Sequence, residues 1–252
     1  MTAAAKHLAR KDGFNAESEA LAMEWRFGTA SPEQVIAAAR DRWEDRFALV
    51  SSFGTESAVL LHIAASVSKE LPVLFLDTLK LFPETRAYRD ALVDRLGLVD
   101  VRDISPAPAD LDRDDPGGDL WRTNTNRCCF IRKVKPLNET LGDFRAWANG
   151  RKRYQGGRRS TLAHFEAADG RVKVNPLAHW RREDVQAYLD FHDLPRHPLE
   201  AQGFPSVGCT HCTDRVRNGE HSRAGRWRGQ QKSECGIHLS YARNEELAGP
   251  GT

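Results

Sequence analysis

The five cysteines are the residues of this chain whose spacing most directly suggests chemistry. Cys128 and Cys129 are adjacent, whereas Cys209 and Cys212 are separated by two residues. Cys235 stands alone in the run Lys-Ser-Glu-Cys-Gly-Ile-His. Two separated pairs can supply four thiolates to one metal centre, and this leaves a fifth thiol for other chemistry. We therefore predict four metal ligands and one nucleophile.

The nature of the metal centre depends on how the two pairs are spaced. Cys209 and Cys212 alone fit a thiol redox pair, half of a zinc site or half of an iron–sulfur site. They lie late in the chain, in a Gly- and Pro-rich region, where a redox pair is not expected. Adjacent cysteines suit zinc poorly, because neighbouring residues on a helix point about 100° apart. We favour a [4Fe–4S] cluster over zinc, and over Cys128 and Cys129 as buried small hydrophobic residues.

Cys235 is the predicted nucleophile. A cysteine attacks as a thiolate, which nearby positive charge favours. Four basic residues lie close to it in sequence: Arg223, Arg226, Lys232 and His238. Glu234 opposes them, and without those neighbours an inert thiol would be the better interpretation. Because residues 228–252 are mostly polar, we expect a mobile tail that carries Cys235 between a site and a partner.

Length and composition limit the classes of protein. The chain has 252 residues, of which 40% are hydrophobic and 29% charged, and this excludes disordered and fibrous proteins. A net charge of +2 gives no argument for a nucleic-acid or membrane partner. Residues 1–10 do not resemble a secretory signal, and no stretch approaches the roughly 20 apolar residues that span a bilayer. We expect a cytoplasmic protein with reduced thiols.

Short apolar runs alternate with helical patterns, which predicts an α/β protein with a doubly wound, mostly parallel sheet. The predicted strands are 47–52, 71–77, 98–102, 144–149 and 172–177. The predicted helices are 31–40, 57–65, 83–96, 128–137 and 181–192. Residues 107–118, rich in Asp, Pro and Gly, are predicted to form an exposed loop. We divide the chain into a helical segment (1–45), a nucleotide-binding domain with the metal centre (46–227) and the tail (228–252).

Two strand ends and one basic stretch predict an anion site. The turn at 51–57, Ser-Ser-Phe-Gly-Thr-Glu-Ser, opens a helix whose first N–H groups can bind phosphate, although it has no Walker lysine and can equally be a plain connection. Asp77 and Thr78 end the next strand, where open sheets bind ligands. Residues 150–160 contain three Gly and five Arg or Lys, and we interpret them as a loop over a polyanion rather than a solvated loop.

Together these motifs resemble the adenylyl-sulfate/phosphoadenylyl-sulfate (APS/PAPS) reductase family, and within it the assimilatory APS reductases, from about residue 47 to 238. Five segments carry the likeness: the phosphate loop at 51–62, Leu-Asp-Thr-Leu-Lys-Leu-Phe-Pro-Glu-Thr at 76–85, Cys-Cys-Phe-Ile-Arg-Lys at 128–133, Arg-Ala-Gly-Arg-Trp at 223–227 and Glu-Cys-Gly-Ile-His at 234–238. The chain departs from the family where Leu79 and Lys80 replace Gly-Arg, and where Lys152 and Arg153 replace Arg-Arg.

The resemblance implies an adenine nucleotide alpha-hydrolase-like fold and an assimilatory enzyme that reduces APS to sulfite and AMP, towards cysteine. It implies an S-sulfocysteine on Cys235, resolved by thioredoxin or a glutaredoxin-like reductant, and leaves a homo-oligomer open. The implied catalytic residues are Cys235, Lys133, Arg223, Arg226 and His238. The implied cluster ligands are Cys128, Cys129, Cys209 and Cys212. The implied substrate-binding residues are Ser51, Ser52, Gly54, Thr55, Glu56, Ser57, Leu76, Asp77, Thr78, Arg153 and Arg158.

Three other functions stay open. Members of the family with both cysteine pairs generally use APS, but some also accept PAPS. A tRNA-thiolating enzyme of the ATP pyrophosphatase type would share the sheet, although its usual Ser-Gly-Gly-x-Asp-Ser loop is absent here. A nucleotide-binding sensor without catalysis would leave the Glu-Cys-Gly-Ile-His motif unexplained.

Overall fold

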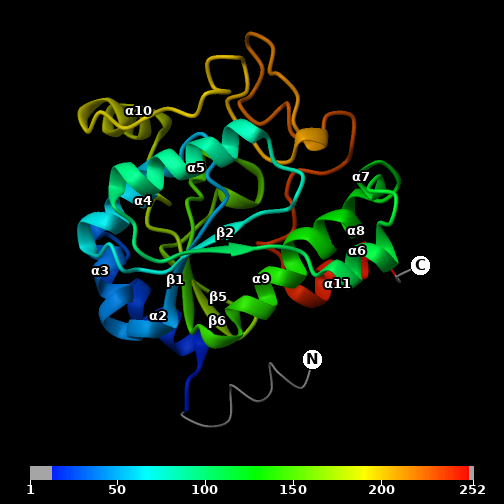
Figure 1. Ribbon diagram of the computed structural model, residues 1–252. Helices are drawn as coiled ribbons and strands as arrows, with labels where there is room; N and C mark the ends of the chain where they lie inside the picture. The colour runs from blue at the N-terminus through cyan, green and yellow to red at the C-terminus, as the bar shows by residue number, and fades with distance from the viewer. Residues whose placement is uncertain (1–12, 250–252) are drawn as a thin grey trace.

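A computed structural model describes residues 13–249 as an α/β fold around one six-stranded sheet (Figure 1). The strands are β1 (Phe47–Ser51), β2 (Val73–Leu76), β3 (Val101–Ile104), β4 (Ala146–Ala148), β5 (Phe165–Ala168) and β6 (Arg171–Val174). They lie in the order β3-β2-β1-β4-β6-β5, and every pair is parallel except β5–β6. The predicted fold class is confirmed. Residues 1–12 of the predicted helical segment and 250–252 of the predicted tail lie outside the described residues.

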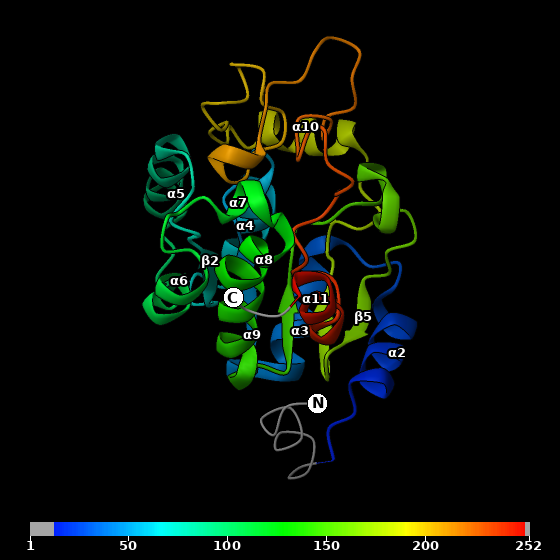
Figure 2. The same cartoon turned by 90° about the vertical axis from the view of Figure 1, so that its right-hand side faces the viewer.

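Helices pack on both faces of the sheet (Figures 1 and 2). One face is covered by α2 (Ala16–Phe27), α3 (Pro32–Trp43), α4 (Ser57–Val67), α5 (Pro83–Leu96) and α10 (Arg182–Phe191). The other side carries α6 (Pro108–Asp114), α7 (Leu120–Thr123), α8 (Thr125–Cys129), α9 (Lys135–Thr140) and α11 (Tyr241–Ala248). None of the helices in the described part of the chain is long and apolar enough to cross a membrane.

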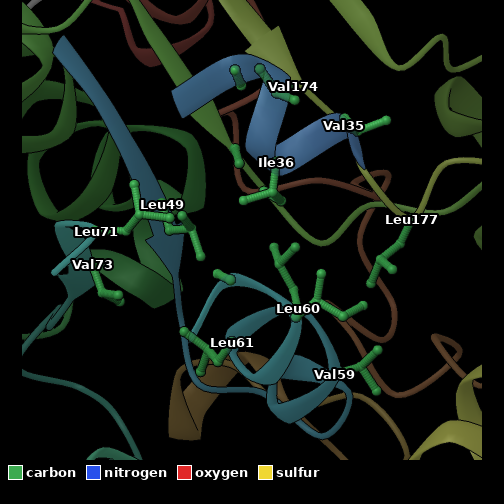
Figure 3. Close-up of a cluster of buried hydrophobic side chains, with 14 of the residues drawn as sticks. Val35, Ile36, Leu49, Val59, Leu60, Leu61, Leu71, Val73, Val174 and Leu177 are labelled. Carbon is green, nitrogen blue, oxygen red and sulfur yellow. The ribbon is translucent and has the colours of Figure 1, made fainter. Parts of the chain in front are cut away.

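The two faces of the sheet have separate cores because side chains alternate along each strand. In β1, Phe47 and Leu49 enter the larger core, whereas Ala48 and Val50 enter the smaller one. Figure 3 shows Leu49 in the larger core, near side chains from α3 and α4. A strand buried on both sides reads as a continuous apolar run, which is why β1 was recognisable from the sequence.

The N-terminal helices belong to the same larger core. Ser31 caps α3 through a reciprocal pair of hydrogen bonds with Gln34: the Gln34 N–H donates to Ser31 Oγ at 3.3 Å, and the Ser31 N–H donates to Gln34 Oε1 at 2.9 Å. The capped helix then buries Val35 and Ile36 completely. The local start signal and the apolar face therefore agree.

The antiparallel edge strand β5 was missed by the sequence prediction. It is short and only partly buried, so its hydrophobic pattern is weak. Its turn carries the available signal, because Asp169 and Gly170 both have positive φ angles, of 50° and 72°. An Asp-Gly pair of this kind is the usual two-residue hairpin turn, and it could have revealed the strand.

The prediction of an exposed loop at 107–118 is wrong for Pro108–Asp114, which form α6, and for three acidic side chains that are buried; the turn at 116–117 is exposed as predicted. The buried carboxylates are those of Asp110, Asp114 and Asp115. They are buried because basic residues downstream neutralise them; Arg132, for example, donates to Asp115 at 2.5 Å. A high Asp content indicates exposure only when no such partners exist.

The predicted tail is packed on the domain over its described part. Ile237 contacts both smaller apolar clusters, and α11 buries Ala248. Gly236 has a φ of +100°, and its carbonyl accepts a hydrogen bond at 2.9 Å from the buried Asn244. These contacts define one docked position, and movement of the tail stays a prediction.

Replacing Gly225 by alanine should destabilise the fold by about 1–3 kcal/mol, because overpacking forces the backbone to shift. A Cβ at Gly225 would lie 2.0 Å from the Asp214 carbonyl oxygen. Urea unfolding measures the loss. Gly142→Ala is the matched control, since a Cβ there meets nothing within 4 Å. Equal stability of the two variants would contradict the packing described here.

Candidate active site

A cavity of about 210 Å³ opens at the carboxyl ends of β1 and β4. Strand β1 lies between β2 and β4, so the chain reverses its direction of winding at this point. Open α/β sheets bind ligands at such switch points. The turn between β1 and α4 forms one wall, and the basic loop after β4 forms another. The fold therefore brings together the two stretches that we predicted to bind an anion.

The turn after β1 is held rigid by short-range contacts. Phe53 has a φ of +47°, and its N–H donates to Ser51 Oγ at 3.1 Å while its ring packs against Phe75. The Ser57 N–H and hydroxyl both donate to the Gly54 carbonyl, at 3.0 and 2.6 Å. All six predicted residues of this turn line the cavity: Ser51, Ser52, Gly54, Thr55, Glu56 and Ser57.

Glu56 is bound by protein groups rather than free to face a ligand. Its carboxylate accepts hydrogen bonds from Lys152 Nζ at 2.7 Å, from Gln155 Nε2 at 3.1 Å and from the Tyr154 hydroxyl. Burial acts to raise the pKa of Glu56, but the charge and hydrogen bond of Lys152 outweigh it and lower that pKa overall. Glu56 therefore joins the turn after β1 to the basic loop and positions Lys152.

The basic loop divides into residues that line the cavity and residues that do not. Arg151, Lys152 and Arg159 line it. Arg153 is exposed and donates to the Leu162 carbonyl at 2.7 Å, and Arg158 points to a separate groove. The sequence predicted a basic anion loop but selected Arg153 and Arg158, because charge alone does not show which side chains turn inward.

The segment at the end of β2 also contains residues that line the cavity and one predicted residue that does not. Leu76 and Thr78 line the cavity, as we expected of a substrate site. Asp77 lies outside the lining; its carboxylate accepts hydrogen bonds from Arg86 at 3.0 Å and from the Leu79 N–H at 2.9 Å. Leu79 has a φ of +59°, so Asp77 holds the turn in a conformation that few side chains adopt.

Cys235 lines the same cavity and is half-buried. The four predicted catalytic partners line it too: Lys133, Arg223, Arg226 and His238. Arg226 donates to the carbonyls of Val207 and Cys212, at 3.0 and 3.3 Å, so its hydrogen bonds leave its charge uncompensated. The thiol and three of these partners come from residues 223–238, and the fold brings Lys133 to them from a distant part of the sequence.

Burial and neighbouring charges determine the protonation states of Arg223 and His238, which line the cavity beside Cys235. Burial, together with the charge of Arg159, lowers the pKa of Arg223 to about 10, which still leaves it charged at neutral pH. Burial and then nearby cations, Arg151 first, lower the pKa of His238 well below its ordinary value. His238 is therefore neutral near pH 7, and its ring stacks on Trp147.

Lys133 lies between the cavity and the four cysteines and lines both spaces. It belongs to a π-helical turn, Phe130–Val134, that interrupts the helix carrying the cysteine pair. Burial acts to lower the pKa of Lys133, but the thiols of Cys209 and Cys235 outweigh it and raise that pKa overall. Lys133 thus places a fixed positive charge beside the thiols of Cys209 and Cys235.

The four paired cysteines surround one small cavity next to the larger one: Cys128, Cys129, Cys209 and Cys212. Burial is the main cause that raises the pKa of Cys128 to about 12 and of Cys129 to about 11. Residues 13–249 contain no set of three or more His, Cys, Asp or Glu arranged for a single metal ion. Four thiols around one shared space are the donor set of a [4Fe–4S] group, and they fit such a group by their chemistry.

Trp121 and His211 also line the cysteine cavity, and sequence reasoning missed them. Their rings are stacked, with centroids 4.4 Å apart and planes inclined by 9°. Thr78 Oγ1 lies 3.2 Å from the Cys209 sulfur on the inner side. The position of His211 inside the Cys-x-x-Cys motif was the only signal available for it.

Comparison with known proteins agrees with this site. The phosphoadenosine phosphosulfate reductase domain family matches residues 46–215. An adenosine 5'-phosphosulfate reductase of Mesorhizobium japonicum is 49% identical over 85% of this chain and 85% of its own. One from Chelativorans sp. is 46% identical over 92% of this chain and 95% of its own. A crystal structure of the Candida auris phosphoadenylyl-sulfate reductase has a TM-score of 0.61 at 24% identity, covering 75% and 91% of the two chains, and supports the fold alone.

The sheet, with its cation-lined switch point and the thiol that lines the same cavity, is that of a sulfonucleotide reductase fold. The chain belongs to the phosphoadenosine phosphosulfate reductase domain family. The predicted family is therefore confirmed, and so is the predicted enzyme class, an oxidoreductase that acts on sulfur groups.

Glu56→Gln should destabilise the protein by about 3 kcal/mol, because it leaves the buried Lys152 ammonium without its carboxylate. Since the pKa of Glu56 is lowered in the fold, its contribution is complete above its unfolded pKa of about 4.3 and is lost as the pH falls through the folded value. Urea unfolding at several pH values should show that loss for the native chain and not for Glu56→Gln.

The double variant Glu56→Gln/Lys152→Met is the control for this pair. Removing both charges should restore part of the lost stability, because no unpaired ion stays buried. A double variant less stable than Glu56→Gln alone would contradict the pairing described above.

Proposed function

We propose that this enzyme reduces adenylyl sulfate to sulfite and AMP, through an S-sulfocysteine on Cys235 and with thioredoxin as the reductant, in assimilatory sulfate reduction towards cysteine. One observation carries the proposal: Cys235 lines the same cavity as the phosphate turn and four side chains suited to an anionic centre. The relatives named as adenosine 5'-phosphosulfate reductases support the choice of substrate.

In the first step, the Cys235 thiolate attacks the sulfur of the phosphosulfate. An S–S bond forms, the S–O bond breaks, and AMP leaves with the electron pair of that bond. A thiolate and a sulfate repel each other, so cations must offset the charge of the oxygens. Lys133, Arg223 and Arg226 supply that charge, and neutral His238 supplies a hydrogen-bonding group.

In the second step, one thiolate of a dithiol attacks the Cys235 sulfur and displaces sulfite, which leaves a mixed disulfide. The second thiol of the dithiol then attacks the first dithiol sulfur in this mixed disulfide and releases Cys235 as a thiolate. The two electrons that reduce the substrate come from this dithiol, which ends as a disulfide. Thioredoxin has this chemistry, and a glutaredoxin-like protein would serve the same role.

Cys128, Cys129, Cys209 and Cys212 would hold a [4Fe–4S] cluster in the adjoining cavity. Bound there, such a group would contribute local charge and structural support rather than net electrons. Lys133 lines both that cavity and the cavity of Cys235. Its ammonium would therefore place a positive charge close to both the cluster and the nucleophile.

Two other functions differ in what they require of the site. A reductase that prefers phosphoadenylyl sulfate would use the same cavity and nucleophile, so substrate choice must be measured. A tRNA-thiolating enzyme would need its own phosphate-loop sequence, and this chain has Ser-Phe-Gly-Thr-Glu-Ser instead.

Incubation of the anaerobically purified enzyme with adenylyl sulfate, without reductant, should release AMP once per active site. Mass spectrometry should find a sulfo adduct on the Cys235 peptide and none on the Cys235→Ser variant, which should still bind nucleotide. Release of sulfite faster from phosphoadenylyl sulfate than from adenylyl sulfate would contradict the proposed substrate. An unmodified Cys235 peptide in protein that retains its iron would contradict the mechanism.

The cluster is tested by Cys209→Ser. The native protein should contain iron and sulfide and show a broad visible absorption that the variant loses, because one of four thiolate ligands is removed. Cys235→Ser is the matched control and should keep both the iron and the absorption. Stoichiometric zinc in the native protein would contradict the assignment.

A further inference from the structure

A second, wider hollow adjoins the substrate cavity on the outer surface. It measures about 550 Å³ and shares part of its wall with the cavity, through Arg223, Arg226, Trp227 and Glu234. Lys232 and Ser233, which precede the nucleophile, form another part of its lining. Figure 2 shows this part of the chain, coloured orange to red, passing from the top of the molecule down to α11. We call this hollow the outer groove.

The outer groove is strongly basic. Its cationic lining residues are Arg158, Arg223, Arg226, Arg228 and Lys232. Within the part of the chain that the structure describes, the one carboxylate among its lining residues belongs to Glu234, which pairs with Arg159 at 2.6 Å. The groove therefore presents a positive surface beside the entrance to the active site.

Among the described residues, two of the three cations at its rim have no carboxylate partner, and the third has a partly exposed one. Arg158 is exposed and has no hydrogen-bond or ion-pair partner among residues 13–249. Arg228 is exposed too, but it pairs with Glu220 through two hydrogen bonds, at 3.0 and 2.8 Å, and donates to the Arg215 carbonyl at 3.1 Å. Because both side chains of this ion pair reach solvent, the pair is weak and Arg228 can exchange it for a carboxylate of a partner. Lys232 meets neutral groups, the Asn126 amide oxygen and the Trp227 ring. None of these three side chains lines the substrate cavity.

A protein reductant that acts on Cys235 must bind at the surface next to the cavity. On the proposed function, on which this inference rests, a protein dithiol must approach the Cys235 sulfur after AMP has left. Cys235 lines the cavity, and the groove is the adjoining surface on the side of residues 232–234. Rim charges of one sign accelerate the approach of a partner of opposite charge and fix its orientation.

We propose that the outer groove is the docking surface for the reductant, a small protein dithiol whose active site is surrounded by acidic residues. Arg158 and Arg228 bind those acidic residues at the rim, while the residues before Cys235 form the inner contact. Arg158, which the sequence suggested as a substrate ligand, thus serves the second half of the reaction instead of the first.

The test compares two reductants with one enzyme. Arg158→Glu and Arg228→Glu should each raise the KM for thioredoxin about tenfold, the equivalent of roughly 1.4 kcal/mol, because a favourable charge contact becomes a repulsive one. Neither should change the turnover with dithiothreitol, which needs no docking surface, nor the single release of AMP without reductant. Added salt should raise the KM for thioredoxin in the native enzyme and much less in Arg158→Glu.

Arg40→Glu is the matched control, because it reverses an exposed charge on α3, away from the groove (Figure 1). An unchanged KM for thioredoxin in both rim variants would overturn the docking proposal. Equal losses with thioredoxin and dithiothreitol would also overturn it, since they would assign the groove to the substrate. Absence of AMP release from the native enzyme would instead contradict the proposed function. That assay contains no reductant, so its outcome is independent of docking.

Discussion

The structure depends on holding several cations around one cavity without letting their repulsion open it. Lys152, Arg159 and Arg223 are largely buried near the carboxyl ends of the strands, and each would destabilise the fold if left unpaired. Two carboxylates offset them: Glu56 binds Lys152, and Glu234 binds Arg159. Both carboxylates also join distant segments, so the charge balance and the assembly of the site are the same set of contacts.

The carboxylates do not neutralise every cation around the cavity, and Arg226 keeps its full charge. Among residues 13–249, Arg226 contacts two backbone carbonyls and the Trp227 ring, which orient its guanidinium without neutralising it. Gly208 makes room for that guanidinium, because a Cβ there would lie 2.2 Å from Arg226 Nη2. The cations that are paired with carboxylates, Lys152 and Arg159, therefore stabilise the wall of the cavity. Arg226, whose charge is not neutralised, can attract an anion. The same principle of a preorganised charge, fixed before the substrate arrives, is how enzymes stabilise anionic transition states.

Much of the fold and part of the site could be predicted from the sequence. Buried parallel strands are continuous apolar runs, so β1 and β2 were recognised. The cysteine pairs and Cys235 line two different cavities, and the separate roles predicted for them stay predictions. Inward and outward positions in the basic loop could not be predicted, because Arg151 and Arg153 are alike in sequence and differ only in what they pack against. The exposed loop predicted at 107–118 failed for a related reason: its carboxylates are buried by partners, such as Arg132, that lie elsewhere in the chain.

The contact between Gly236 and Asn244 has a consequence for how Cys235 can travel. Because α11 is packed against the domain beyond it, the segment that carries the thiol is a loop fixed at both ends and not a free end of the chain. Such a loop explores a small volume, so the local concentration of Cys235 at the cavity stays high while its outward reach is short. On the proposed function, a thiol tethered in this way is always present for the substrate, and the protein that reduces it must come to the enzyme surface.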